Sequence, residues 1–218
     1  MNNLSALLAH NSLILALTIL SQQCNRHANQ LENCNANYKK ARLDFNTYYT
    51  HNDTVYLQKA IADVQLATKC DETRRSAIEL KLSALSLLKQ YEHGYKYVDS
   101  LQMDDFRISY KKIMWHNYFL AQDYESKSDT VNRNKNYNEI IKTIENLIQQ
   151  ENLEKSKIDE EAYADLFSIK ARIMDKEKIH SELDVLAKRY PEKKEFFEDL
   201  KNTTSYGRAE SSADPVPQ

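Results

Sequence analysis

Residues 137–147 read YNEIIKTIENL, and this stretch decides the predicted fold because its pattern occurs four times in the chain. It aligns without gaps on LQKAIADVQLA at 57–67, YEHGYKYVDSL at 91–101 and KEKIHSELDVL at 176–186. In each copy, small or apolar residues stand at i, i+4 and i+7, the spacing that places side chains on one face of a helix. The aligned sets are Ala60/Gly94/Ile140/Ile179, Val64/Val98/Ile144/Leu183 and Ala67/Leu101/Leu147/Leu186. The pattern therefore predicts four amphipathic helices, each of which buries one face.

The spacing of the four copies indicates a repeated pair of helices. The second copy begins about 34 residues after the first, which is the period of the tetratricopeptide repeat, and the later copies follow at longer intervals. Pro191 follows the fourth copy where these repeats commonly place proline, and Leu120-Ala121-x-x-Tyr124 is similar to the family's Leu-Gly-x-x-Tyr signature. The body of the chain thus resembles a degenerate tetratricopeptide-repeat protein. The resemblance implies an all-α fold, a tetratricopeptide-like α-solenoid of helix hairpins with a shared core. A non-repeating helical bundle is the alternative.

Periodicity and capping residues together predict helices along the whole body of the chain. The expected ranges are 4–21, 28–50, 53–69, 73–89, 91–102, 105–126, 134–151, 158–174, 176–189 and 191–201. Asp71, Asp104 and Ser156 are expected to cap the helices that follow them, and Ser156-x-x-Asp159 is similar to a capping box. No strand is predicted.

Composition excludes several classes of protein. Two glycines and three prolines are too few for the turns and phosphate loops of barrels, sandwiches and dinucleotide-binding folds. Lys and Arg, 30 in all, nearly balance 32 Asp and Glu, so the concentrated positive charge of a nucleic-acid binder is missing. No nucleophile motif or His-x-x-x-His pair occurs, and the six histidines stand singly. We therefore predict a protein that is not an enzyme, with no catalytic residues, no cofactor, no metal and no nucleic-acid partner.

The N-terminal residues 1–24 are predicted to form a signal peptide or an apolar anchor. Residues 12–20, SLILALTIL, have the length of a signal-peptide core and are shorter than the roughly 20 residues that span a bilayer. Leu20-Ser21-Gln22-Gln23-Cys24 resembles a bacterial lipoprotein signal, which implies lipidation of Cys24 and a membrane tether. These interpretations predict the periplasm or a cell-envelope membrane. The alternative is a cytoplasmic protein in which residues 4–20 pack as an apolar first helix.

The remaining chain is predicted to hold one helical-repeat domain at 25–201 and a disordered tail at 202–218, where Ser, Thr, Asn, Pro and Gly dominate. Cys24, Cys34 and Cys70 are an odd number of cysteines without metal-ligand spacing. In an exported chain a Cys34–Cys70 disulfide is an option. We expect free thiols, because nothing in the sequence supplies the geometry that a disulfide requires.

The candidate binding surface is a stripe on the helix predicted at 105–126. Lys111, Trp115, Tyr118 and Gln122 stand at i, i+4, i+7 and i+11 and share one face, while Ile113, Leu120, Ala121 and Tyr124 form the neighbouring stripe, predicted to be core. The resemblance implies that Trp115, Tyr118 and Gln122 line the concave groove of the solenoid. Aromatic rings anchor partners well because they bury a large area with few rotatable bonds. The alternative is that Trp115 completes the core.

The predicted function is that of a non-catalytic helical-repeat module that binds a protein or peptide. An exported or membrane-tethered module of this kind would serve as an envelope assembly factor or adaptor. Two alternatives remain: an immunity-type protein that neutralises a secreted bacterial toxin by direct binding, and a self-assembling structural component. Fold by itself does not choose among them.

Overall fold

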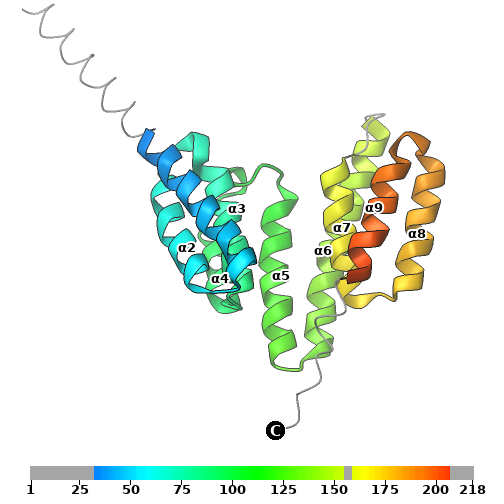
Figure 1. Ribbon diagram of the computed structural model, residues 1–218. Coiled ribbons are helices and arrows are strands. Elements are labelled where there is room, and N and C mark those ends of the chain that lie inside the picture. The colour runs from blue at the N-terminus through cyan, green and yellow to red at the C-terminus, as the bar shows by residue number, and fades with distance from the viewer. Residues whose placement is uncertain (1–31, 155–158, 207–218) are drawn as a thin grey trace, which may run out of the picture. The chain divides into compact units, whose positions relative to one another are not determined.

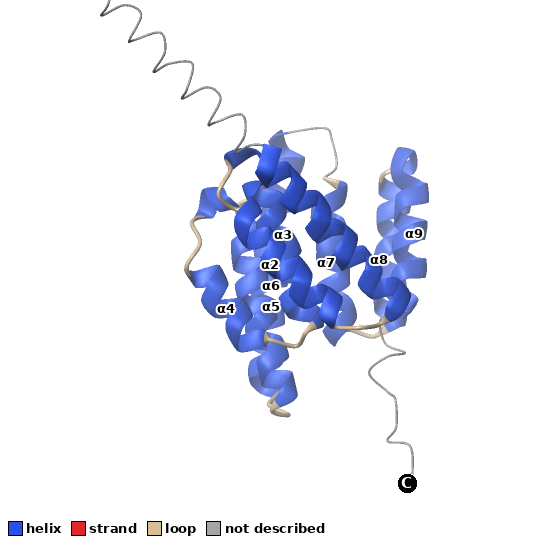
Figure 2. Cartoon of the chain, turned by 60° about the vertical axis from the view of Figure 1, so that its left-hand side comes forward, coloured by secondary structure: helices blue, strands red, loops and turns tan. Residues whose placement is uncertain are grey.

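The computed structural model describes residues 32–154 and 159–206, and all regular structure within them is helical. Figures 1 and 2 show helices joined by short loops, and no strand occurs among the described residues. The predicted all-α class is therefore confirmed. Within the same ranges, no helix is both long enough and apolar enough to cross a membrane.

The chain divides after Gln90 into two compact units, which are described separately. The first unit contains a helix at residues 32–51, followed by α2 (Val55–Ala67) and α3 (Asp71–Leu87). The second contains α4 (Tyr91–Asp99), a 3₁₀ turn at Met103–Asp105, α5 (Tyr110–Ser126), α6 (Thr130–Glu154), α7 (Glu160–Ile173), α8 (Lys176–Arg189), a 3₁₀ turn at Pro191–Lys193 and α9 (Lys194–Tyr206).

The four repeated segments fall on every second helix, namely α2, α4, α6 and α8. Their first and second aligned positions are buried in all four copies, and Val64, Val98, Ile144 and Leu183 are completely so. At the third position the copies differ. Ala67 and Leu101 are buried, whereas Leu147 and Leu186 are only partly buried and the next residues, Ile148 and Ala187, enter the core instead. The predicted apolar face is thus confirmed, with its last position wrong by one residue in α6 and α8.

Several predicted helix ends are wrong because local side-chain bonds decide them. The α5 helix begins at Tyr110 rather than at residue 105, since Asp105 accepts a hydrogen bond from the Gln102 backbone N–H at 2.8 Å and closes a separate 3₁₀ turn. The α6 helix begins at Thr130 instead of 134, where Asp129 accepts from the Asn132 N–H at 3.0 Å. At the other end of the chain, α9 continues to Tyr206, so residues 202–206 are helical rather than part of a tail.

The predicted caps are corrected in the same way. Cys70, not Asp71, occupies the N-cap of α3, and Asp104 lies inside the 3₁₀ turn. Asp159 caps α7 by accepting hydrogen bonds from the backbone N–H groups of Glu161 and Ala162 at 3.0 and 3.2 Å. Ser156 lies outside the described residues, as do residues 4–20, Cys24 and 207–218.

Three helices are followed by a residue with a left-handed backbone although no glycine is present at their ends. Asn52, Lys89 and Ser128 have φ values of 50°, 55° and 59° and follow the helix at 32–51, α3 and α5. The Gln90 N–H then bonds the Leu85 carbonyl at 2.9 Å, and the Asp129 N–H bonds the Tyr124 carbonyl at 2.9 Å. This is the Schellman arrangement, in which a left-handed residue satisfies carbonyls at the helix end. A scarcity of glycine therefore does not prevent tight turns in this chain.

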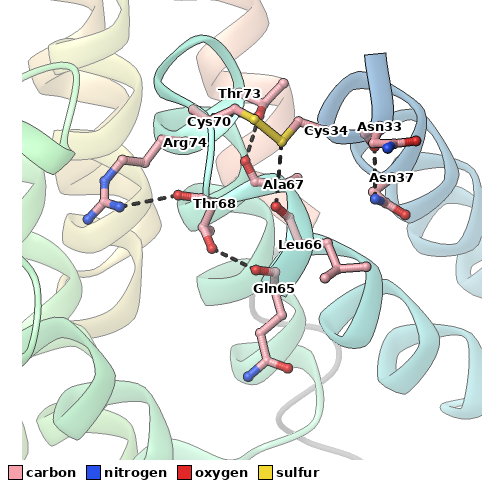
Figure 3. Close-up of a disulfide and its surroundings, with 10 residues drawn as sticks. All are labelled: Asn33, Cys34, Asn37, Gln65, Leu66, Ala67, Thr68, Cys70, Thr73 and Arg74. Carbon is pink, nitrogen blue, oxygen red and sulfur yellow. Dashed lines mark hydrogen bonds between the residues drawn. A yellow bond between two sulfur atoms is a disulfide. The ribbon is translucent and has the colours of Figure 1, made fainter. Parts of the chain in front are cut away.

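The first unit is held by a small apolar core and a disulfide. Ala41, Ala60, Val64, Ala67 and Ala77 form one buried cluster whose short side chains let helices approach closely. Leu57, Ile78, Leu82 and Leu85 are buried in the same unit. Cys34 and Cys70 are bonded, with Cα atoms 6.3 Å apart, a separation usual for a disulfide. Our expectation of free thiols was therefore wrong for these two residues, because packing of the helix at 32–51 brings them together. Figure 3 shows the bond beside the turn that joins α2 to α3.

The second unit is a series of packed helices around one continuous core. Neighbours in the chain pack in the order α4 on α5, α5 on α6 and α6 on α7, while α9 packs on α8 and α7. Figure 1 shows α9 next to α7 and α8. Gly94 permits the approach of α4 to α5, because a methyl group built at this position would overlap the ring of the completely buried Phe119. Ile113 is exposed, so its predicted place in the α5 core stripe is wrong, and Tyr110, Met114 and Ala121 face the core.

Candidate functional site: a pocket between α6, α7 and α8

A pocket of about 500 Å³ opens between α6, α7 and α8. This volume lies within the range of sites that hold small molecules or a few side chains of a partner. The lining residues are Glu145, Ile148, Gln149, Tyr163, Leu166, Phe167, Lys170, Ser181, Glu182, Val185, Leu186 and Arg189. They come from helices of the second unit alone.

The pocket walls follow from helical spacing. On α7, Tyr163, Leu166, Phe167 and Lys170 stand at i, i+3, i+4 and i+7 and therefore share one face. On α8, Val185 and Leu186 face the same space. Val185 is 61% exposed, so an apolar side chain remains in water at the edge of the pocket. The walls can therefore bury an apolar group of another molecule.

One end of the pocket carries a buried lysine held by two carboxylates. The Lys170 side chain is 9% exposed, and its Nζ lies 2.8 Å from Glu145 Oε1 and 2.7 Å from Glu182 Oε2. Burial alone would lower the pKa of Lys170, but the hydrogen bonds to the two carboxylates outweigh it and raise the pKa above the ordinary value. The ammonium group thus stays protonated at neutral pH. Together these three groups, the Lys170 trio, carry a net charge of −1.

The opposite end of the pocket carries a positive charge. Arg189 is exposed, and its guanidinium carbon lies 5.6 Å from the centre of the Tyr190 ring. No carboxylate among the described side chains forms an ion pair with Arg189. The pocket therefore has an apolar centre between a negatively charged end and a positively charged end.

The stripe predicted from the sequence lies elsewhere, on α5, and its lysine is buried in ion pairs with another helix of the same unit. Lys111 is 8% exposed. Its Nζ lies 3.0 Å from Glu161 Oε1 and 2.5 Å from Asp165 Oδ2, both on α7, and the Tyr110 hydroxyl donates to Asp165 Oδ2 at 2.6 Å. Burial raises the pKa of Tyr110, and the bond to Asp165 adds to the rise. Lys111 is thus occupied in joining α5 to α7.

The other three members of the stripe are half-buried. The rings of Trp115 and Phe119 stack with centroids 5.7 Å apart, and Tyr118 meets Trp115 edge to face at 5.8 Å. Gln122 donates to the Tyr137 hydroxyl and to Glu125 Oε2. The structure gathers the aromatic rings but brings none of the four residues into the pocket of α6–α8. Their role in binding stays a prediction.

Sequence reasoning missed this pocket, although α7 carries a signal for it. Lys170 follows Phe167 on the apolar face of the helix, and a charged residue on such a face must find a partner when it is buried. Its partners stand on the preceding helix, α6, and on the following helix, α8. Neither partner is therefore apparent from local pattern.

Among the residues whose side chains are described, no group of three or more His, Cys, Asp and Glu could hold a metal ion. Cys24, the residue expected to be lipidated, is outside the described ranges. Comparison of the chain with family models, with curated proteins and with solved structures found no match of any of the three kinds.

Proposed function

We propose that this chain is a non-catalytic helical-repeat protein that binds a protein or peptide partner at the pocket between α6, α7 and α8. The observation that carries the proposal is the pocket itself, an open apolar space with a charged group at each end. A partner side chain placed there gains by burying apolar area, at about 25 cal/mol per Å². The raised pKa of Lys170 favours binding over covalent chemistry at this place. The stripe of Trp115 and Tyr118 is a second surface for the same kind of partner.

The proposed architecture is a tetratricopeptide-like α-solenoid. Two features support it: the repeated segments occupy every second helix, and the left-handed turn residues Asn52, Lys89 and Ser128 recur at similar intervals along the chain. Each interval is close to the length of a helix-pair repeat. The last helix pair, α7 and α8, differs from the others. Met174, which follows α7, has an extended backbone instead of a left-handed one.

We propose an exported location, in the periplasm or tethered to a cell-envelope membrane. The Cys34–Cys70 bond supports it, because disulfides form and persist in oxidising compartments and are rare in the cytosol. An apolar segment at residues 12–20 fits the same proposal. An envelope assembly factor or adaptor needs a surface that binds another protein. A protein that neutralises a secreted toxin needs one as well.

The test compares two valine variants in parallel. Val185→Glu places a charge at the edge of the pocket, and Val131→Glu makes the same change at a residue of α6 that is 77% exposed and does not line the pocket. Both positions are exposed, so neither variant should change stability by more than about 0.5 kcal/mol. Affinity purification from the cells that make the protein should recover a partner with the wild type and Val131→Glu but not with Val185→Glu.

A second pair of changes decides between the two surfaces. If Trp115→Ala with Tyr118→Ala removes the partner while Val185→Glu retains it, the binding surface lies on α5. If every variant retains the same proteins, the proposed function is wrong at both places. Light scattering of the purified protein separates a discrete monomer from concentration-dependent assembly, the behaviour of a structural component.

A further inference from the structure

We propose that the partner segment taken by the pocket is an amphipathic α-helix, with a carboxylate and a basic side chain two turns apart on either side of apolar residues. This inference rests on the proposed function and specifies the chemistry of the partner. The carboxylate faces Arg189, the basic group faces the Lys170 trio, and the apolar residues enter the centre of the pocket.

The charge pattern follows from the two ends of the pocket. At the Lys170 trio, Lys170 uses one oxygen of each carboxylate, and the second oxygens, Glu145 Oε2 and Glu182 Oε1, have no other described partner. Glu145 and Glu182 are 42% and 33% exposed, so both remain accessible to a donor from outside. A carboxylate has lone pairs for several hydrogen bonds. With a net charge of −1, this end favours an added ammonium or guanidinium group.

The opposite end favours an anion. The Arg189 guanidinium projects from the exposed side of α8 and carries five donors in a planar fork that suits a carboxylate. Its guanidinium lies over the ring of Tyr190 and makes no hydrogen bond or ion pair with another described side chain, which leaves those donors for a partner.

The distance between the two ends matches the repeat of a helix. Glu182 and Arg189 stand at i and i+7 on α8, which places them about 10.5 Å apart along the axis at 1.5 Å per residue. A partner helix that lies along α8 meets this spacing with charged residues at i and i+7. Its residues i+3 and i+4 then fall between them, over Leu166, Phe167 and Val185.

A helix also suits the apolar walls better than an extended segment does. Its backbone N–H and C=O groups bond one another, whereas an extended peptide would bring unpaired groups against the side chains of Leu166 and Phe167. Burying such groups without partners costs free energy. The pocket lies among helices, and in the described residues no strand edge exists to pair an extended chain.

The test uses the full chain and three synthetic helical peptides of about 15 residues, labelled with fluorescein. All three carry leucine at i+3 and i+4 in an Ala- and Gln-rich background. They differ only at i and i+7, which hold glutamate and lysine, two lysines or two glutamates. Fluorescence anisotropy at low salt gives the three dissociation constants. The glutamate–lysine peptide should bind about fivefold more tightly than either twin, the effect of one partly exposed ion pair.

Charge reversal on the protein provides the matched control. Arg189→Glu should make the two-lysine peptide the tightest of the three. Lys188→Glu changes the same helix by the same charge but lies outside the pocket lining, and it should keep the wild-type order. Val185→Glu should weaken the binding of all three peptides.

Two results would overturn the inference. If the three peptides bind equally well and Val185→Glu still weakens them, the charge pattern is wrong while the apolar pocket keeps its proposed function. If no peptide binds, or if Val185→Glu leaves all binding unchanged, an amphipathic helix does not dock in this pocket.

Discussion

Reduction of the Cys34–Cys70 bond should unfold the first unit while the second stays folded. The two cysteines are 36 residues apart in the chain. In the chain-entropy treatment, opening a loop of this length costs about 4 kcal/mol of stability at 25 °C. The first unit buries Leu57, Ile78, Leu82 and Leu85 beside its alanines, but domains are stable by only about 5–15 kcal/mol, so such a loss removes much of the stability of this unit. The equilibrium between folded and unfolded forms of this unit should shift by about a thousandfold.

Hydrogen exchange followed by mass spectrometry measures this effect in each unit separately. Adding a phosphine reductant, or replacing both cysteines by alanine, should remove the protection of α2 and α3. Protection of α6 and α8 should stay, and the fluorescence of Trp115, the single tryptophan of the chain, should report an intact second unit. With a urea m-value of about 2 kcal/mol/M, the midpoint for the first unit should fall by about 2 M.

Thiol titration gives the control for this prediction. In the full chain made without lipid on Cys24, only this one of the three cysteines should react in denaturant without reductant. If all three react, the disulfide does not form in the protein. If one reacts but reduction leaves the exchange of α2 and α3 unchanged, the bond forms and the stability argument fails.

Three further changes test the packing of the second unit. Gly94→Ala should destabilise it by about 1–3 kcal/mol in urea unfolding, because the overlap with the Phe119 ring outweighs a gain of about 1 kcal/mol in helix propensity; a more stable variant would show that Phe119 moves freely. Ser128→Gly should stabilise by up to about 1 kcal/mol, since a non-glycine residue at φ 59° is strained, and a loss of stability would argue against the left-handed turn. The loss of stability caused by Lys170→Met should depend on pH. The folded-state pKa of Lys170 is raised above 10.5, so its stabilising contribution is complete below that pH and is lost as the pH rises through the raised value. Urea midpoints of wild type and variant should therefore converge as the pH rises through the raised pKa of Lys170, and a constant difference would contradict the protonated assignment.

The helical body of the protein could be predicted because its signal is local. Val64, Val98, Ile144 and Leu183 each lie four residues after another buried residue, and this spacing is visible in a short window of sequence. Helix ends were less predictable. The start of α5 depends on a bond from Gln102 to Asp105, and two helix ends adopt the Schellman turn with Lys89 and Ser128 in place of glycine.

The site and the disulfide could not be predicted because they depend on distant residues. Lys170 is buried between side chains from α6 and α8, and Cys34 meets Cys70 only through the packing of the first unit. Lys111 shows the opposite case. Its spacing with Trp115 and Tyr118 placed it on a predicted binding stripe, but the carboxylates of α7 hold it inside the protein.

Photocrosslinking in the cells that make the protein tests most directly whether the pocket of α6–α8 is a docking surface. A benzophenone amino acid is introduced at Val185, on the pocket edge, or at Val131, which is more exposed and does not line the pocket. Position 185 should give a discrete crosslinked species that position 131 does not give, and the added Arg189→Glu change should reduce it. Crosslinks of equal yield and identity from both positions, or none from position 185, would contradict docking at this pocket.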